Sequence, residues 1–241
     1  MRTIKFFDSL EELNTFAAGK IVEIADASII SRGIFTIALA GGSTPKSLYQ
    51  LLAADEYKNK VEWSKVFFFF GDERNVLPDS DESNFKMAKE NLFSPLSIAA
   101  SNIERWETEL EVPEKIAAGY ASKLEMFFRA APRFDLILLG MGDDGHTASL
   151  FPFTEALRET ERNAVANPVE KLKTTRLTLT FPVINNARNV VFLVKGADKA
   201  ETLHTVLEGE FEPEKYPAQA VKPVSGELLW LIDREAARFL T

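Results

Sequence analysis

The sequence predicts an α/β protein, a Rossmann-like three-layer αβα sandwich with a mainly parallel central sheet. Two observations carry this prediction: apolar runs of strand length recur along the chain, and segments with helical spacing lie between them. Continuous apolar runs are typical of central strands covered on both faces, and alternation of strand and helix favours parallel pairing. The 241 residues contain no repeat or evident linker, so we expect a single domain over residues 1–241.

The predicted elements can be placed in chain order. Five apolar runs are predicted strands: Phe35–Leu39, Val66–Phe70, Asp135–Leu139, Val190–Val194 and Leu228–Ile232. Four segments are predicted helices: Pro45–Ala54, Ser83–Phe93, Pro113–Ala130 and Asp198–Leu207. The segment Arg176–Phe181 differs, because leucine alternates with threonine there, which indicates a strand with one polar face.

Charge and composition exclude several classes of protein. Lys and Arg total 28 against 36 Asp and Glu, a formal charge of -8 without a basic stripe, so we expect no nucleic-acid partner. The chain has no cysteine, which excludes disulfides and thiolate catalysis, and only two histidines, so we expect no metal and no other cofactor. Residues 1–14 lack the apolar core of a signal peptide, and no segment resembles a membrane span. We expect a cytoplasmic protein with no membrane partner, monomeric or weakly homo-oligomeric.

Ligands of open α/β sheets bind beyond the carboxyl ends of the strands, so the residues after each apolar run are the candidates for a site. The first such junction is Gly41-Gly42-Ser43-Thr44-Pro45. Glycines allow close backbone approach, Ser43 or Thr44 suits a helix cap, and exposed amides at a helix start attract phosphate. This pattern is neither a Walker loop nor a dinucleotide fingerprint. It indicates an anion cradle, although an ordinary capped turn has the same residues.

The second junction places Gly71-Asp72-Glu73-Arg74 after a buried strand. The guanidinium fork of Arg74 suits a phosphate or carboxylate, and Asp72 suits the orientation of a neighbour or proton transfer. A solvated strand end with a local ion pair is the alternative interpretation. Further along, Ser83-Asn84 suits a helix start.

The third junction, Gly140–Thr147, is rich in glycine and contains His146 two residues after Asp144. Histidine is the residue best suited to general base catalysis near neutral pH, and a nearby carboxylate can orient or charge it. His204 lies in a predicted amphipathic helix and illustrates the commoner, structural use of histidine. A serine nucleophile is not favoured, because the nucleophile-elbow motif is missing. Acid–base chemistry on a phosphorylated small molecule is the prediction that remains.

The motifs together resemble the 6-phosphogluconolactonase family, within the wider group that includes glucosamine-6-phosphate deaminases. The matching segments are 40–45, 71–74 with 83–84, 140–142 with 144–152, 176–180, Gly196 with Lys199, and a tail with Pro217, 222–223 and Trp230. They run in one order over nearly the whole chain, and the segment 140–152 is the most specific.

The resemblance implies hydrolysis of 6-phospho-D-glucono-1,5-lactone to 6-phosphogluconate, the second step of the oxidative pentose phosphate pathway, with a phosphorylated sugar lactone as the partner molecule. It implies that His146 is the general base and that Asp144 supports it. It also implies that Gly42, Ser43 and Thr44 contact phosphate, with Arg74, Arg176 and Lys199 as cationic partners and Asp72 among the binding residues. Three loop positions depart from the family pattern: Leu77 stands at an expected proline, Ser80 at a frequent histidine and Phe153 at a common glycine.

Two other functions remain open. A deaminase–isomerase related to the family would use Asp72 for proton transfer at carbon and His146 for ring opening. Against it, Phe151 stands where the deaminases carry a glutamate, and Arg74 where they carry a tyrosine. The other function is a non-catalytic sugar-phosphate sensor, since related folds serve transcription regulators. The first strand-like run begins by Phe35, which leaves no room for a DNA-binding module before it.

Overall fold

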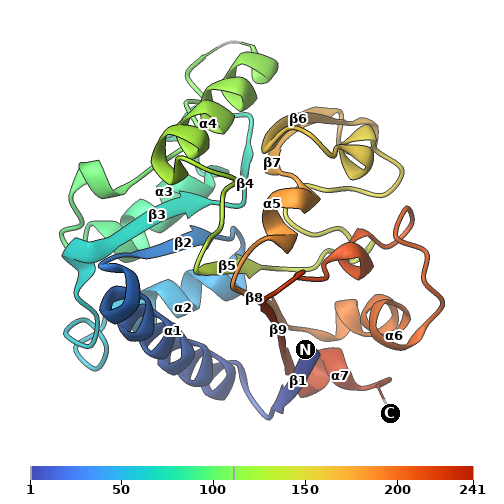
Figure 1. The fold of residues 1–241 in the computed structure, drawn as a ribbon. Coiled ribbons are helices and arrows are strands. Elements are labelled where there is room, and N and C mark those ends of the chain that lie inside the picture. Colours follow the sequence, from blue (N-terminus) through green and yellow to red (C-terminus); the bar gives the residue numbers. More distant parts are fainter. Residues whose placement is uncertain (1, 111, 241) are drawn as a thin grey trace.

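A computed structural model describes residues 2–110 and 112–240 and has the predicted α/β architecture (Figure 1). Among these residues, six strands form a parallel sheet in the order β1-β9-β8-β5-β2-β3. They are β1 (Arg2–Phe7), β2 (Phe35–Leu39), β3 (Val66–Phe70), β5 (Leu136–Leu139), β8 (Asn189–Val194) and β9 (Glu227–Asp233). The five predicted apolar runs are all strands of this sheet, which confirms the predicted fold class.

Helices cover both faces of the sheet. They are α1 (Leu10–Arg32), α2 (Ser43–Ala53), α3 (Asn84–Ala88), α4 (Pro113–Phe128), α5 (Phe181–Asn185), α6 (Ala200–Glu208) and α7 (Arg234–Ala237). Figure 1 shows α1 and α2 together on one face and α4 on the other. The helix predicted over 83–93 is α3 followed by a π-helical turn, Lys89–Phe93. No helix within the described ranges is long and apolar enough to cross a bilayer.

The N-terminal segment corrects one expectation, because Phe35 does not begin the first strand. β1 precedes it and pairs in parallel with β9, and α1 fills most of the residues between β1 and β2. β1 is an edge strand whose residues are largely exposed, so it lacks the continuous apolar run of a central strand. The segment before Phe35 is thus a strand and a helix of the α/β sandwich itself.

A second sheet was not predicted. It contains β4 (Asp72–Arg74), β7 (Thr174–Leu179) and β6 (Ala164–Val169), in the antiparallel order β4-β7-β6. β7 has the expected face of polar residues, Thr174, Arg176 and Thr178, but this face is not solvated throughout, because Thr178 is fully buried and bonds to backbone on both sides. Its hydroxyl donates to the Leu179 carbonyl at 2.9 Å and accepts from the Ser149 N–H at 3.3 Å. Leu177 and Leu179 of this sheet belong to the same apolar core as the main sheet.

The order of the strands fixes where a ligand can bind. The chain leaves β2 through α2 toward β3, whereas from β5 it returns in the opposite direction to β8. The connections therefore diverge between the adjacent strands β2 and β5, and they leave a crevice beyond the carboxyl ends of these strands. The first and third candidate junctions, residues 41–45 and 140–147, follow these two strands.

Two buried tyrosines hold the backbone at the carboxyl ends of β2 and β3. The Tyr49 hydroxyl accepts from the Ala40 N–H at 3.0 Å and donates to the Ala40 carbonyl at 2.8 Å. Tyr120 makes the same pair of bonds to Phe70, at 2.8 and 3.1 Å. Burial raises the pKa of both hydroxyls far above the usual range, so they remain neutral donors. The backbone that enters the crevice is thereby fixed from beneath.

Candidate active site

A cavity of about 400 Å³ opens at the carboxyl ends of β2, β3 and β5. The glycine-rich junctions after β2 and β5 and the charged junction after β3 all line it. Its lining includes seven of the nine predicted site residues: Gly42, Asp72, Arg74, Asp144, His146, Arg176 and Lys199. The crevice that the topology leaves open is therefore where the candidate side chains converge.

The loop after β5 is held in shape by its own hydrogen bonds. The Gly142 N–H donates to the His146 carbonyl at 2.9 Å, and the Thr147 hydroxyl donates to the Gly140 carbonyl at 2.9 Å. Gly145 has φ +79°, a left-handed conformation that favours glycine. A Cβ on Gly142 would overlap the His146 ring, so the imidazole lies directly against this backbone.

His146 and Asp144 form a close pair. Nδ1 of His146 lies 2.5 Å from Oδ1 of Asp144, and the His146 N–H donates to the same oxygen at 3.2 Å. Lys171 donates to the other carboxylate oxygen at 3.1 Å. Partial burial raises the pKa of Asp144, but the hydrogen bond and charge of His146, together with Lys171, hold it well below its usual range. An ionised Asp144 fixes the proton on Nδ1, which leaves Nε2 as the basic nitrogen.

One face of the imidazole is covered by an aromatic ring. Phe151 stacks on His146 with ring centroids 4.1 Å apart and planes 22° apart. Phe151 itself is buried. With the carboxylate at its edge and Phe151 at its face, His146 has a fixed orientation.

The junction after β2 differs from its prediction in one respect. Neither Ser43 nor Thr44 caps α2, because the N-cap is Gly42, with φ +104° and no side-chain hydrogen bond to the helix. Ser43 and Thr44 form the first turn of α2 and do not line the cavity, whereas Gly41 and Gly42 do. A helix start without a side-chain cap leaves its first amides available to an anion. Only glycine fits at Gly41, since a Cβ there would overlap the Asn84 side chain.

The charged residues after β3 are not a solvated strand end, which corrects that alternative. Asp72 is 9% exposed and Glu73 is 2% exposed. Asp72 accepts from the Ser149 hydroxyl at 2.7 Å and from the Asn84 amide at 3.3 Å. The network holds the Asp72 carboxylate at the cavity wall and ties together the loops after β3 and β5.

Glu73 fastens α3 to β4. Its carboxylate accepts from three backbone N–H groups, those of Arg74, Asn84 and Phe85, each at 2.8 Å. Burial raises the pKa of Glu73, and these three hydrogen bonds oppose that rise. As predicted, a helix begins at this point, with Ser83 as the N-cap of α3 and a hydrogen bond from the Lys86 N–H at 3.2 Å.

Besides Lys171, three cations line the cavity. Arg74 and Arg176 are register partners across β4 and β7, and Lys199 approaches from the turn before α6. Arg74 donates to the Glu82 carbonyl at 2.6 Å, while Nε of Arg176 is buried and has no hydrogen-bond partner among the described residues. Burial and the positive charge of Arg74 lower the pKa of Arg176. Lys199 pairs with Asp198 at 3.1 Å.

Sequence reasoning missed three residues of this site. Lys171 is the second partner of Asp144, Ser149 binds Asp72, and Phe151 covers His146. Ser149 and Phe151 lie in the motif that includes His146, so their position near the histidine was a usable signal. Lys171 comes from the turn between β6 and β7, and nothing in its local sequence indicated a contact with Asp144.

The fold and the cavity define a class: an α/β enzyme with a histidine–aspartate pair in a cavity lined by cationic side chains. Residues 8–230 match the family model described as glucosamine-6-phosphate isomerases/6-phosphogluconolactonase, and the chain belongs to this family.

Two relatives and one solved structure that match most of the chain are each named 6-phosphogluconolactonase. A 6-phosphogluconolactonase of Synechocystis sp. is 44% identical over 217 residues, 88% of each chain, and that of Homo sapiens is 37% identical over 99% of this chain and 93% of its own. The solved structure of the 6-phosphogluconolactonase from Trypanosoma brucei superposes with a TM-score of 0.88 at 33% identity, covering 100% of this chain and 99% of that one. The resemblance inferred from the motifs is thereby confirmed.

Proposed function

We propose that the protein hydrolyses 6-phospho-D-glucono-1,5-lactone to 6-phosphogluconate, in the cytoplasm, by general-base activation of water. The observation that carries the proposal is that His146, held by Asp144 at 2.5 Å, faces the same cavity as Arg74 and Arg176. A base and several cationic side chains within one cavity suit a phosphorylated substrate. The names of the relatives support the choice of a lactone.

The chemistry assigned to His146 has two steps. Nε2 removes a proton from water as its oxygen attacks the lactone carbonyl, and a tetrahedral intermediate forms. The imidazolium then gives that proton to the ring oxygen as the carbon–oxygen bond of the ester breaks, which yields the open-chain acid. General catalysis of this kind is worth about 10²–10⁴-fold. Asp144 stabilises the imidazolium and keeps the productive tautomer throughout.

We assign the phosphate of the substrate to the cationic side chains that line the cavity. Arg74 and Arg176 offer planar donors that match phosphate oxygens, and Nε of Arg176 has no other partner among the described residues. Lys199 and the uncapped start of α2, with Gly42, Ser43 and Thr44, add positive potential near the cavity. Binding at a distance from the reacting carbon orients the carbonyl toward His146.

The arrangement supports hydrolysis over the deaminase–isomerase alternative. An isomerase needs a base placed for proton transfer at carbon, and Asp72 is instead engaged by Ser149 and Asn84. Phe151, whose ring is apolar, stacks on His146 and stands where the deaminases are expected to carry a glutamate. We assign Asp72 to binding of a substrate hydroxyl. The alternative of a non-catalytic sensor is not favoured, because it gives the His146–Asp144 pair no role.

The test is hydrolysis of freshly prepared 6-phosphogluconolactone, coupled to 6-phosphogluconate dehydrogenase, with the spontaneous rate subtracted. We expect rapid turnover by the wild type, a loss of 10²-fold or more in His146→Ala, and no change in His204→Ala. His204 is the matched control, since it lies in α6 and contacts Glu208 rather than the cavity. A wild type without activity above background, or an active His146→Ala, would contradict the proposal.

A further inference from the structure

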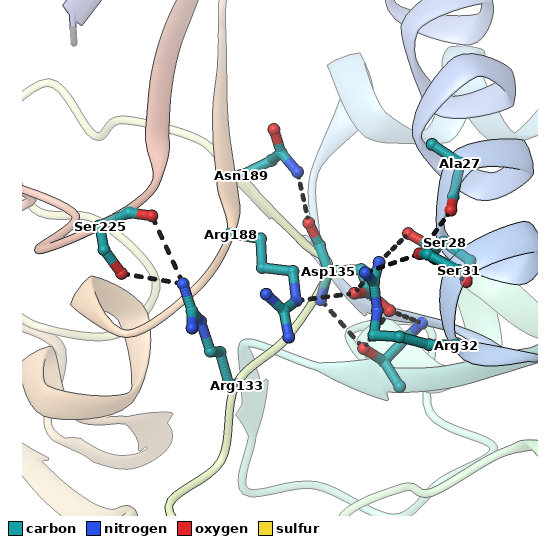
Figure 2. Close-up of polar contacts among 10 residues, drawn as sticks. Ala27, Ser28, Ser31, Arg32, Arg133, Asp135, Arg188, Asn189 and Ser225 are labelled. Carbon is teal, nitrogen blue, oxygen red and sulfur yellow. Dashed lines mark hydrogen bonds and ion pairs between the residues drawn. The ribbon is translucent and has the colours of Figure 1, made fainter.

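Three arginines lie in a row at the edge of the sheet opposite the cavity, and two of them, Arg32 and Arg188, contact the buried carboxylate of Asp135 (Figure 2). Arg32 ends α1, Arg188 immediately precedes β8, and Arg133 lies two residues before Asp135, which itself precedes β5. These positions are at the amino ends of the strands, whereas His146 follows the carboxyl end of β5. The cluster is therefore separate from the candidate active site.

The bonding capacity of Asp135 is already used. Its Oδ2 accepts from the Thr36 N–H and hydroxyl, both at 2.9 Å. Its Oδ1 lies 2.8 Å from Nη2 of Arg32 and 3.3 Å from Nε of Arg188. Arg32 is also bound by Ser28 and Ser31, each at 2.8 Å. Asp135 and Arg32 thus have their hydrogen-bond partners within the protein.

Arg133 and Arg188 are left with unused donors. Nε of Arg133 is buried without a hydrogen-bond partner in the described chain, and its guanidinium is held through Nη2 by Ser225 at 2.8 Å. Nε of Arg188 faces Asp135 without normal hydrogen-bond geometry, and no bond from its two Nη atoms is found among the described residues. Since burying donors without partners is unfavourable, these groups indicate a missing acceptor.

The net charge of the cluster also indicates a missing acceptor. Asp135 pairs with Arg32 and Arg188, and Arg133 adds a third positive charge beside Arg188, so these four residues carry two positive charges in excess. Arg188 lies between Arg32 and Arg133 in Figure 2, and burial together with the charges of both neighbours lowers the pKa of Arg188. The Arg188 side chain is 35% exposed, so an ion from solvent can reach it.

We propose that Arg133 and Arg188 form a second anion site, one that binds a phosphate-type oxyanion at the amino edge of the sheet. A doubly charged tetrahedral anion matches both the excess of two charges and the planar donors of two neighbouring guanidinium groups. The site has no part in the lactone chemistry, since it lies at the other end of the strands. Its occupation stabilises the junction of α1, β5 and β8 by neutralising the repulsion among the arginines.

The test is a calorimetric titration of the wild type with inorganic phosphate at constant ionic strength. We expect two equivalents, one in the cavity and one at the arginine cluster. Arg188→Gln and Arg133→Gln should each weaken the second equivalent by ten-fold or more and leave kcat and KM for the lactone unchanged. Arg162→Gln, which removes an equal charge on an exposed arginine paired with Glu159, serves as the control. The unchanged activity shows that the variants are folded, and Arg133, bonded only to Ser225, is the safer substitution.

A parallel titration with methyl phosphate distinguishes the source of the anion. Equal binding of both probes would identify a site open to phosphate monoesters, and binding of inorganic phosphate alone would identify a site for the free ion. The proposal is overturned if the wild type binds one equivalent only, or if both arginine variants titrate as the wild type does.

Discussion

Arg74 and Arg176 lie directly opposite each other in the antiparallel pairing of β4 with β7, at the wall of the candidate active site. Like charges at opposed positions of a sheet are destabilising. The buried Nε of Arg176 is also without a partner in the described residues. A pair placed in this way is unfavourable in the free protein and becomes favourable when an anion lies between the two side chains.

This relationship predicts how Arg176→Gln will behave. We expect KM for the phosphorylated lactone to rise by about 10–100-fold with a smaller change in kcat, because a charge-assisted bond to phosphate is worth about 1.5–3 kcal/mol. The melting temperature without phosphate should not fall, since the substitution removes the repulsion from Arg74. Steady-state kinetics and thermal unfolding check both parts, and a variant with unchanged KM would show that the phosphate binds elsewhere.

Asp144→Asn is predicted to lower the activity. The amide cannot enforce the tautomer of His146 as a carboxylate does, so we expect kcat to fall by about 10²-fold or more. Steady-state kinetics measures this loss, and a variant that keeps the wild-type kcat would show that Asp144 does not hold His146 in its productive form.

The same carboxylate predicts a pH dependence of stability. Because the pKa of Asp144 is depressed in the folded protein, its stabilising contribution is complete above the unfolded pKa of about 4 and is lost as the pH falls. We expect the free energies of unfolding of the wild type and Asp144→Asn to differ at pH 6 and to converge below pH 4. Denaturant titrations at a series of pH values measure this difference, and parallel curves throughout would contradict it.

Gly142→Ala should inactivate the protein without unfolding it. The added Cβ would overlap the His146 ring and approach Asp144 Oδ1 to 2.9 Å, so the histidine must move from its position. We expect a loss of activity comparable to that of His146→Ala, with retained cooperative unfolding. Gly119→Ala is the control, because a Cβ at that position of α4 meets nothing within 4 Å and should stabilise the helix by up to about 1 kcal/mol with full activity.

Phe153 is a loop position that departs from the family pattern, and its backbone has a measurable cost. It has φ +62° and a side chain that is 70% exposed. A left-handed conformation costs a side-chain-bearing residue roughly 1–2 kcal/mol, so Phe153→Gly is expected to raise the free energy of unfolding by up to about 1 kcal/mol. Leu77→Gly, at a similarly exposed loop position without a positive φ, should lower it. Equal effects of the two substitutions would exclude backbone strain at Phe153.

The sequence by itself determined the class of fold and the pairing of His146 with Asp144. Apolar runs such as Val66–Phe70 and Leu136–Leu139 have to be buried on both faces, so their location in a parallel sheet follows from local pattern. His146 and its neighbour Asp144 were readable because two residues of one tight loop meet without help from the rest of the chain.

Only the tertiary structure decided which distant residues meet. β1, β4 and β6 had no distinctive pattern, and the alternation in β7 did not indicate its partners, because the stability of these strands depends on what they pair with. The opposition of Arg74 to Arg176 likewise arises from strand pairing between segments about 100 residues apart. The contact of Lys171 with Asp144 joins a turn to a loop 27 residues away in the sequence. Local pattern specifies what a residue prefers, whereas the register between strands specifies what it touches.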